Sequence, residues 1–415
     1  MAIIKPFKAF RYNTEKIKDL NLVLTQPYDK ISKDKQESYY KKSDYNLVRI
    51  ILNKSTGKDK YQEAAKHLEK WIQEKILIQD QKEAIYYYTQ TYQDPYTGQP
   101  LTRSGLIVLG KLSRENVHAH ERTLAAPKKD RLNLLRTTKA NFGQIFMLYE
   151  DTLDEINQTI RKFSTKADIE VTDEDNNKHK CTIIDDPKTI SQVKHLLKNK
   201  PLFIADGHHR YETALNFSEE MKAKGLHTEA MDYRMMTLVN FHDPGLSILP
   251  THRLLKDIPS FNIKHLLQEL EKYFFITKHE RDSEVITTMR KEKSPCFGIY
   301  SNDSSYYSLK MRKSPVTANF DKELDVVILH KLILEKTLKL TPKSIEDQKN
   351  ITYIRNHQKG IDLVKNKKAQ VLFLLNPTKK KEIIDIASQG LRMPQKSTDF
   401  YPKLLSGLTI YKMPK

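Results

Sequence analysis

The chain has 415 residues, 38% hydrophobic and 30% charged, with a formal net charge of +19. It is long enough for two or three domains, and no stretch approaches the roughly 18 consecutive apolar residues of a transmembrane helix. The Lys excess is spread along the chain as on a solvated surface, so nucleic acid is a minor candidate partner. The N-terminal segment lacks the apolar core of a signal peptide, so we expect a cytoplasmic protein with no membrane partner.

The first 110 residues show strand and helix patterns in turn. Residues 46–52 are a short apolar run that we interpret as a strand. Residues 61–76 carry apolar side chains at helical spacing, with Trp71 as the core anchor. The tyrosine-rich residues 84–92 and the apolar residues 102–110 are separated by an Asp-Pro-Tyr-Thr-Gly turn, which predicts a hairpin.

A first polar cluster follows this hairpin. His118 and His120 form an H-x-H pair, and Glu121 comes next in the chain, just before a predicted helix. An H-x-H pair is a weak metal signal without further ligands at known spacing. A metal-dependent hydrolase that also recruits His208 and His209 is therefore an alternative function.

The second polar cluster lies where a strand meets a helix. Residues 202–205 are four apolar residues that predict a buried strand, and Asp206 and Gly207 supply a turn. A helix is predicted after His209, and residues 233–241 predict the next strand. We interpret this strand, helix and strand as a parallel crossover, which indicates an α/β fold.

This cluster has the groups that phosphoryl transfer requires. Arg210 and the helix start can bind phosphate, Asp206 can hold Mg²⁺, and His208 or His209 can contact phosphate or a proton. Either Glu121 or Glu212 could be the base. Glu212 could instead orient the imidazole of His208, which lies four residues before it. The sequence has no G-x-x-x-x-G-K-S loop, so this is not a P-loop enzyme.

The C-terminal part continues the α/β pattern. Residues 324–338 predict a helix and residues 369–375 a buried strand. Residues 393–407 are irregular, and Lys396, Ser397 and Thr398 within them could close over a nucleotide. We place the domain boundary at 255, with an α/β core over 1–255 and a smaller α/β domain over 256–415 whose C-terminal segment returns toward the site.

Short motifs along nearly the whole chain resemble domain-of-unknown-function family 1015. In chain order they are Ile4-Lys-Pro-Phe, Pro27-Tyr28-Asp29, Tyr45-Asn46-Leu-Val-Arg49, His120-Glu121-Arg-Thr123, Asp130-Arg131-Leu, residues 205–214, Leu375-Asn376-Pro377 and Met393-Pro-Gln-Lys-Ser-Thr-Asp-Phe-Tyr-Pro-Lys403. From these motifs we also assign substrate contacts to His120, Arg131, Tyr28 and Asp29.

The Asp-Gly-His-His-Arg motif also resembles that of ParB/sulfiredoxin-fold enzymes, including free-serine kinases. This resemblance implies a ParB/sulfiredoxin-like core with an additional α/β domain, and a site that contacts phosphate or metal. Carried over to this chain, the resemblance implies phosphate or metal contacts for Asp206, His208, His209 and Arg210. Together with the chemistry of the residues described above, the predicted nucleotide contacts are Gly207, His209, Arg210, Lys396, Ser397 and Thr398. The predicted catalytic residues are Asp206, His208, Glu121 and Glu212.

The resulting prediction is a nucleotide-dependent phosphotransferase that uses ATP or ADP with Mg²⁺. Its acceptor would be a small hydroxyl compound, serine or similar. The alternative from another class is a ParB-like regulatory module that binds a nucleotide or nucleic acid.

Overall fold

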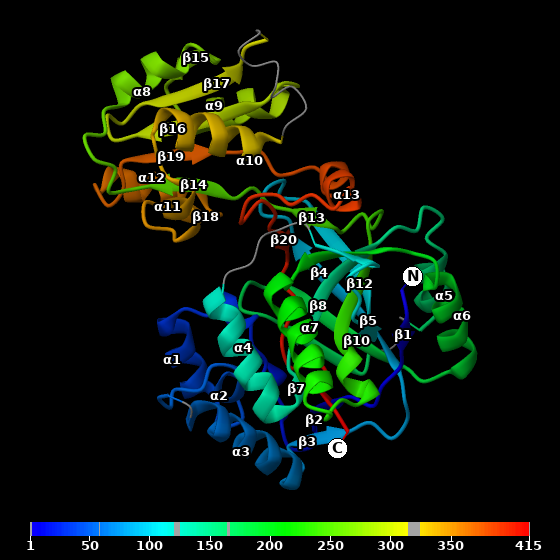
Figure 1. Cartoon of the computed structure of the whole chain (residues 1–415). Helices are drawn as coiled ribbons and strands as arrows, with labels where there is room; N and C mark the ends of the chain where they lie inside the picture. The colour runs from blue at the N-terminus through cyan, green and yellow to red at the C-terminus, as the bar shows by residue number, and fades with distance from the viewer. Residues whose placement is uncertain (1, 58, 120–124, 164–166, 314–323, 415) are drawn as a thin grey trace. The chain divides into compact units, whose positions relative to one another are not determined.

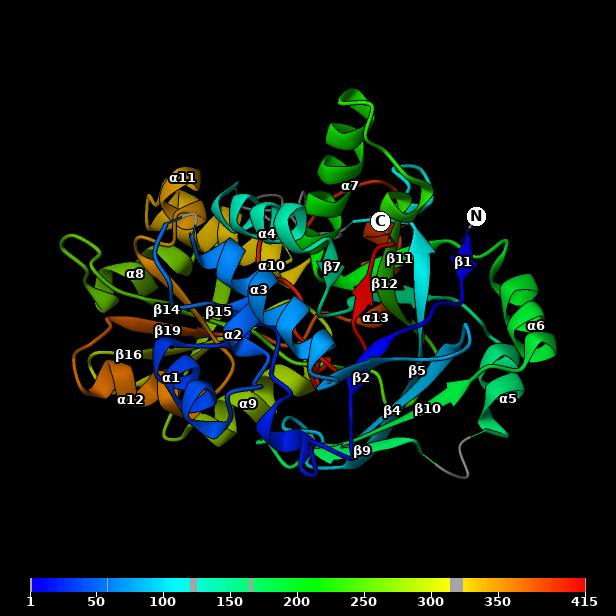
Figure 2. The same cartoon turned by 90° about the horizontal axis from the view of Figure 1, so that it is seen from below.

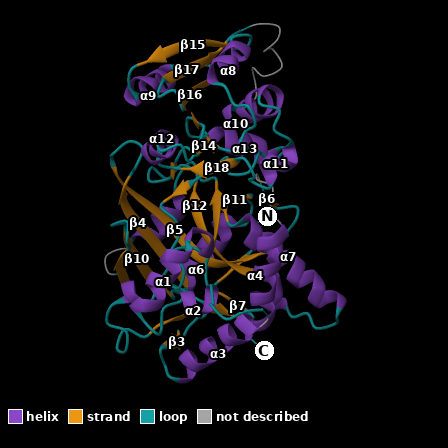
Figure 3. Ribbon diagram, turned by 90° about the vertical axis from the view of Figure 1, so that its left-hand side faces the viewer, coloured by secondary structure: helices purple, strands orange, loops and turns teal. Residues whose placement is uncertain are grey.

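A computed structural model describes residues 2–57, 59–119, 125–163, 167–313 and 324–414. None of the helices in these ranges combines the length and apolar character that a membrane crossing requires. The described residues divide into two compact units: those within 2–119, 125–247 and 400–414 form the first, and those within 248–399 form the second. Both units combine helices and sheets (Figure 3), which confirms the mixed α/β class predicted from the sequence.

One large sheet organises the first unit. In spatial order, its strands are β6 (Val117–His118), β11 (Leu202–Asp206), β8 (Ile145–Tyr149), β12 (Tyr233–Asn240), β5 (Pro100–Lys111), β4 (Ile85–Gln93), β10 (Lys178–Ile184) and β9 (Ile169–Thr172), with β1 (Ile4–Lys5) also paired to β5. Strands β4 and β5 form the predicted hairpin. The tyrosines of β4 are buried in the sheet, and aromatic residues are common in such strands.

The parallel crossover predicted around the central helix is wrong. Strand β8 lies between β11 and β12, antiparallel to β11 and parallel to β12. Strands β11 and β12 therefore run in opposite directions and do not pair. The local sequence could not reveal this arrangement, because β8 comes from a segment more than 50 residues before β11.

Helices surround this sheet. Helices α5 (Glu155–Arg161) and α6 (Pro187–Leu197) lie side by side (Figure 2) and contribute Ile156, Ile160 and Val193 to the main apolar core. The other α-helices of the unit are α1 (Lys33–Lys42), α2 (Val48–Ile51), α3 (Asp59–Gln73), α4 (Ala125–Thr138) and α7 (His208–Ala223), which Figure 1 labels, and the 3₁₀ turn η2 lies at Tyr28–Lys30.

The strand predicted over residues 46–52 is wrong, because this segment contains helix α2. The Asn46 side chain accepts a hydrogen bond of 3.0 Å from the backbone N–H of Val48, which has no partner within the helix. Val48, Ile50 and Ile51 are all buried. A short apolar run buried on all sides has no period that separates strand from helix.

The C-terminal segment is an integral part of the first unit. Strand β21 (Tyr411–Lys412) pairs with β7 (Ala140–Asn141), and Phe10 in β2 (Phe10–Tyr12) exchanges two backbone hydrogen bonds with Ile410. Strand β2 in turn pairs with β3 (Leu77–Gln79). The segment that follows Phe400 is therefore held on both sides by strands from the N-terminal part of the chain.

The second unit is built on a sheet of its own. The strand order is β15 (Phe274–His279), β17 (Tyr306–Met311), β16 (Cys296–Ser301), β19 (Val371–Leu374), β14 (His252–Leu255) and β18 (Ile351–Ile354). Its helices are α8 (Ile263–Leu270), α9 (Asp282–Lys291), α10 (Asp325–Ile328), α11 (Pro342–Glu346), α12 (His357–Lys365) and α13 (Lys380–Ser388). The helix predicted over 324–338 is present, although its second part, η5 (Leu329–Thr337), is π-helical.

Candidate functional site

A β-bulge turns Asp206 to one face of the large sheet. Ile204 pairs with Met147, but Asp206 pairs with the adjacent Phe146, so Ala205 is an extra residue on strand β11. Ile204 and Met147 belong to the main apolar core, whereas Phe146 contacts Phe400 at a ring distance of 5.5 Å. Because side chains alternate along a strand, the extra residue turns Asp206 away from the core and toward the C-terminal segment.

Gly207 connects this strand end to helix α7. Its φ of 96° lies in the range that only glycine adopts readily, and a Cβ there would lie 3.1 Å from the guanidinium of Arg210. No side chain caps the helix at this position. The start of α7, with the positive end of the helix dipole, therefore lies beside Asp206 and Arg210.

Asp206 is surrounded by positive charge. Lys403 Nζ donates a hydrogen bond of 2.8 Å to Asp206 Oδ2, and Arg210 Nη2 lies 3.9 Å from Oδ1. The Asp206 side chain keeps 24% of its exposure, whereas that of Lys403 keeps 9%. Burial raises the pKa of the Asp206 carboxyl, but the charges of Lys403 and Arg210 outweigh this effect and hold the pKa well below its ordinary value.

A buried polar network holds the backbone that carries Lys403. Arg103 is 1% exposed and donates to the carbonyls of Tyr401 at 3.0 Å and Pro402 at 2.6 Å. Gln90 accepts from the same guanidinium and donates to the Lys403 carbonyl at 3.0 Å. Three successive carbonyls are thereby fixed by two side chains of the sheet, which sets where the Lys403 side chain begins.

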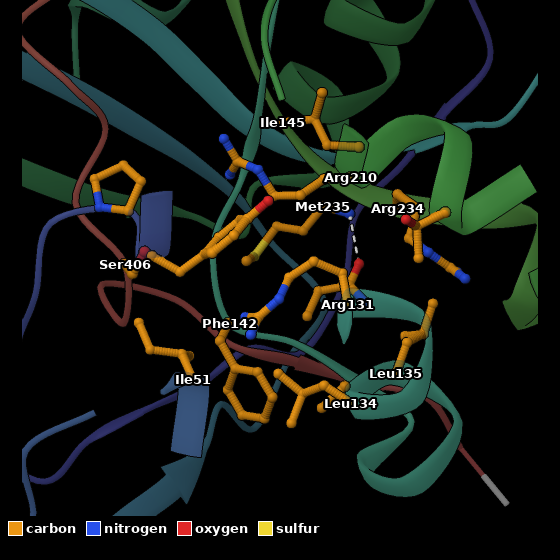
Figure 4. Close-up of a pocket in the computed structure, with 16 residues that line it drawn as sticks. Ile51, Arg131, Leu134, Leu135, Phe142, Ile145, Arg210, Arg234, Met235 and Ser406 are labelled. Atoms are coloured by element: carbon orange, nitrogen blue, oxygen red, sulfur yellow. Dashed lines mark hydrogen bonds between the residues drawn. The ribbon is translucent and has the colours of Figure 1, made fainter. Parts of the chain in front are cut away.

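Two of the predicted substrate contacts also lie in this neighbourhood. The Arg131 guanidinium stacks on the Tyr28 ring at 4.2 Å and is ion-paired with Asp130. Burial raises the pKa of Tyr28, and the nearby charges of Arg131 and Arg210 oppose that rise. Tyr28, Arg131 and Arg210 all line one cavity of about 90 Å³ (Figure 4). Asp29, the predicted substrate contact next to Tyr28, is exposed.

The remaining residues of the central motif lie on helix α7. His208 is 6% exposed at the first helical position, and His209 is half-buried. Glu212 accepts a hydrogen bond of 2.9 Å from Lys128 on α4.

In the first polar cluster, the His118 ring is stacked on the Phe203 ring of the neighbouring strand, with 5.1 Å between the ring centres. His120 and Glu121 lie outside the described residues.

The predicted nucleotide contacts Lys396, Ser397 and Thr398 belong to the second unit. Ser397 is 6% exposed, and its hydroxyl donates to the carbonyl of Pro394 at 2.6 Å. The Lys396 carbonyl accepts from Arg253 at 3.2 Å. Their role in nucleotide binding stays a prediction.

The described ranges contain no group of three or more His, Cys, Asp or Glu side chains placed to hold a metal ion. A Mg²⁺ site needs fewer protein ligands, because this ion often binds one or two carboxylates and completes its coordination with substrate phosphates and water. Asp206 could be such a carboxylate ligand. Its Oδ2 is engaged by Lys403, and its Oδ1 is beyond hydrogen-bond distance of Arg210.

No role for Lys403, Arg103 or Gln90 is predicted from the sequence. A signal for Lys403 was present, since it ends the long motif over residues 393–403. Arg103 and Gln90 also leave a signal, because they stand in phase with the buried residues Ile107 and Tyr88 of their strands. A charged or amide side chain at a buried strand position needs a buried partner.

A sequence model of the family described as Protein of unknown function (DUF1015) matches residues 4–327. No curated protein sequence matches the chain.

Three solved structures are similar to this chain over most of their own length. A free serine kinase variant in complex with ADP has a TM-score of 0.40 at 9% identity, covering 74% of this chain and 91% of that chain. A conserved hypothetical protein from Pyrococcus furiosus has a TM-score of 0.38 at 9% identity, covering 74% and 94%. SbnI with a C-terminal truncation from Staphylococcus aureus has a TM-score of 0.37 at 14% identity, covering 73% and 87%.

Proposed function

We propose that this chain, which belongs to the family described as Protein of unknown function (DUF1015), is a nucleotide-dependent phosphotransferase. Its proposed acceptor is a small hydroxyl substrate. The observation that carries the proposal is the cluster of Asp206, Lys403 and Arg210 at the start of helix α7, with Lys403 at 2.8 Å and Arg210 at 3.9 Å from the carboxylate. Two cations face one carboxylate beside an uncapped helix start, which favours an anionic ligand.

The proposed roles follow from this placement. Arg210 and Lys403 would bind phosphate oxygens, since both are cations held at fixed positions by the protein. Asp206 would stay ionised over the physiological range because its pKa is low. Its Oδ1 would contribute to Mg²⁺ binding, and the ion would neutralise charge on the transferring phosphoryl group.

In the proposed reaction, the acceptor hydroxyl oxygen forms a bond to the γ-phosphorus of ATP while the bond from that phosphorus to the bridging oxygen of ADP breaks. The hydroxyl proton passes to a carboxylate base, so the products are a phosphate monoester, ADP and a protonated carboxyl group. Glu212 already pairs with Lys128, so we assign the base role to Glu121. ADP as donor is the corresponding alternative, with AMP as product.

The test is ADP formation from ATP and Mg²⁺ with and without a panel of small alcohols that includes L-serine. The wild type should form ADP only when an acceptor is present, and Asp206→Asn should lower kcat/KM at least 100-fold while circular dichroism shows an intact fold. Asp185→Asn is the matched control, since Asp185 forms an exposed ion pair with Lys82. Equal turnover in Asp206→Asn and wild type would reject the assigned role.

Nucleotide binding can be tested separately from turnover. ADP should raise the Tm of the wild type, because a ligand that binds only the folded state stabilises it by mass action. The shift should increase with Mg²⁺ and decrease in Asp206→Asn. A Tm that does not respond to ATP, ADP or AMP would contradict the nucleotide part of the proposal.

A further inference from the structure

The cavity lined by Arg210 has a mostly apolar wall (Figure 4). The apolar side chains are Ile51, Leu134, Leu135, Phe142, Ile145 and Met235. They come from helices α2 and α4, strands β8 and β12, and the segment just before β8. A wall of this kind binds an aliphatic or aromatic group and gains about 0.8 kcal/mol for each methylene that it removes from water.

The volume of the cavity favours a small occupant. The space is about 90 Å³, which is smaller than an apolar cavity of about 150 Å³ that binds one benzene ring. A purine base is larger than benzene, so the base of a nucleotide does not fit within this volume. By the same scaling, the space suits an aliphatic group of about three or four carbons.

Polar groups also line the cavity, with the guanidinium groups of Arg131, Arg210 and Arg234 among them. Arg210 lines it from one side (Figure 4), and Arg131, stacked on Tyr28, also lines it. Gly143 forms part of the wall, and a Cβ there would lie 3.0 Å from Ser406 Oγ and 3.5 Å from Arg210 Nη1. The glycine therefore keeps the space next to the guanidinium open. Arg210 is thus shared between the cavity and the Asp206 cluster.

We propose that this cavity is the acceptor subsite, and that the acceptor is a small aliphatic hydroxy acid. Its alkyl group would lie against the Leu134 and Phe142 wall, its carboxylate would face the guanidinium groups, and its hydroxyl would reach the Asp206 cluster past Arg210. L-Serine has no carbon beyond the one that bears its hydroxyl, so it would leave the apolar wall uncovered. The inference rests on the proposed phosphotransferase function for the hydroxyl role, but the subsite itself can be tested by binding alone.

The first experiment measures binding to the full chain by calorimetry without any nucleotide. The probes are glycolate, lactate and 2-hydroxybutyrate, which differ by one carbon at each step. Because each methylene contributes about 0.8 kcal/mol, the Kd should fall about fourfold per carbon. A Kd that does not change along the series would overturn the proposal. So would a Kd for 1,2-butanediol equal to that for 2-hydroxybutyrate, because the carboxylate would then make no contact.

The second experiment fills the cavity. Leu135→Phe adds volume to the wall and should raise the Kd for 2-hydroxybutyrate at least tenfold while leaving the Kd for ADP within twofold. The matched control is Leu215→Phe, because Leu215 packs against the main core and does not line the cavity. An unchanged Kd for 2-hydroxybutyrate in Leu135→Phe places the ligand elsewhere and overturns the subsite. A raised Kd for ADP shows that the nucleotide occupies the cavity and also overturns it.

The two proposals fail in different ways. If hydroxy acids bind with the expected trend but no acceptor supports ADP formation, the subsite stands and the phosphotransferase function fails. If ADP forms with L-serine as readily as with 2-hydroxybutyrate, the phosphotransferase function stands and the aliphatic acceptor class is wrong.

Discussion

Lys403 donates a 2.8 Å hydrogen bond to Asp206 although the two residues stand 197 positions apart in the sequence. The Lys403 side chain is 9% exposed and reaches the carboxylate from a segment whose carbonyls are held by Arg103 and Gln90. A Lys that is almost buried and bonded to a carboxylate is costly to place. An anionic ligand that also contacts the Lys403 ammonium group would offset this cost of burial.

Replacing Lys403 by Met should weaken nucleotide binding. A hydrogen bond to a charged group contributes about 1.5–3 kcal/mol, so the Kd for ADP measured by calorimetry should rise roughly 10- to 100-fold. The control is Lys412→Met, which removes a Lys from the same C-terminal segment that pairs with Glu69. An equal Kd in the Lys403 and Lys412 variants would show that Lys403 has only a structural role.

Arg103→Met tests whether the buried network positions Lys403. The change leaves the Tyr401 and Pro402 carbonyls without their donor, and the free energy of unfolding in urea should fall by about 2–4 kcal/mol. The Kd for ADP should rise as in Lys403→Met, and the double variant should bind no worse than Lys403→Met alone.

Arg11→Met provides the comparison for Arg103→Met, because Arg11 forms a partly buried ion pair of 2.6 Å with Asp80 in the same unit. It should lose stability without changing the Kd for ADP. Additive effects of Arg103→Met and Lys403→Met on that Kd would show that Arg103 does not act through Lys403.

Gly207→Ala should disturb both the backbone and Arg210. A positive φ costs a residue with a Cβ about 1 kcal/mol or more, and the new methyl group would press on the guanidinium at 3.1 Å. Gly225→Ala is the control, since Gly225 has a φ of 66° and a methyl group there would have nothing within 4 Å of it. Both variants should lose stability in urea, and only Gly207→Ala should weaken ADP binding. Equal ADP binding in the two would contradict the role of Arg210.

Asp130 should make a pH-dependent contribution to stability. Burial raises the pKa of its carboxyl, but Arg131, Lys60 and other donors outweigh this and lower the pKa to about 2. Because the folded pKa is below the unfolded value of about 3.9, the contribution is complete above that unfolded value and is lost as the pH falls toward 2. At pH 7 it amounts to roughly 2 kcal/mol.

The measurement is urea unfolding of wild type and Asp130→Asn at pH 7 and pH 3. The difference between the two proteins in the free energy of unfolding should be roughly 2 kcal/mol at pH 7 and about half of that at pH 3. A difference that does not depend on pH would mean that Asp130 acts through packing or neutral hydrogen bonds and not through its charge.

The sequence was sufficient for features that depend on neighbouring residues. The strand over 202–205, the turn at Gly207 and the helix after it were all predicted, and so was the β4–β5 hairpin. Hydrophobic period and turn chemistry act within a few residues, so a linear pattern records them. Family membership was also readable, because short motifs are spread over most of the chain.

Only the tertiary structure decided which distant residues meet. The bulge at Ala205 turns Asp206 toward the C-terminal segment, strand β8 separates β11 from β12, and Lys403 completes the cluster. Each of these depends on which strands pair and in which register, and pairing energy comes from side chains that the local pattern does not connect. The sequence by itself determined that an acid, two imidazoles and a guanidinium stand at a strand-to-helix turn, and long-range packing determined which cations face that acid.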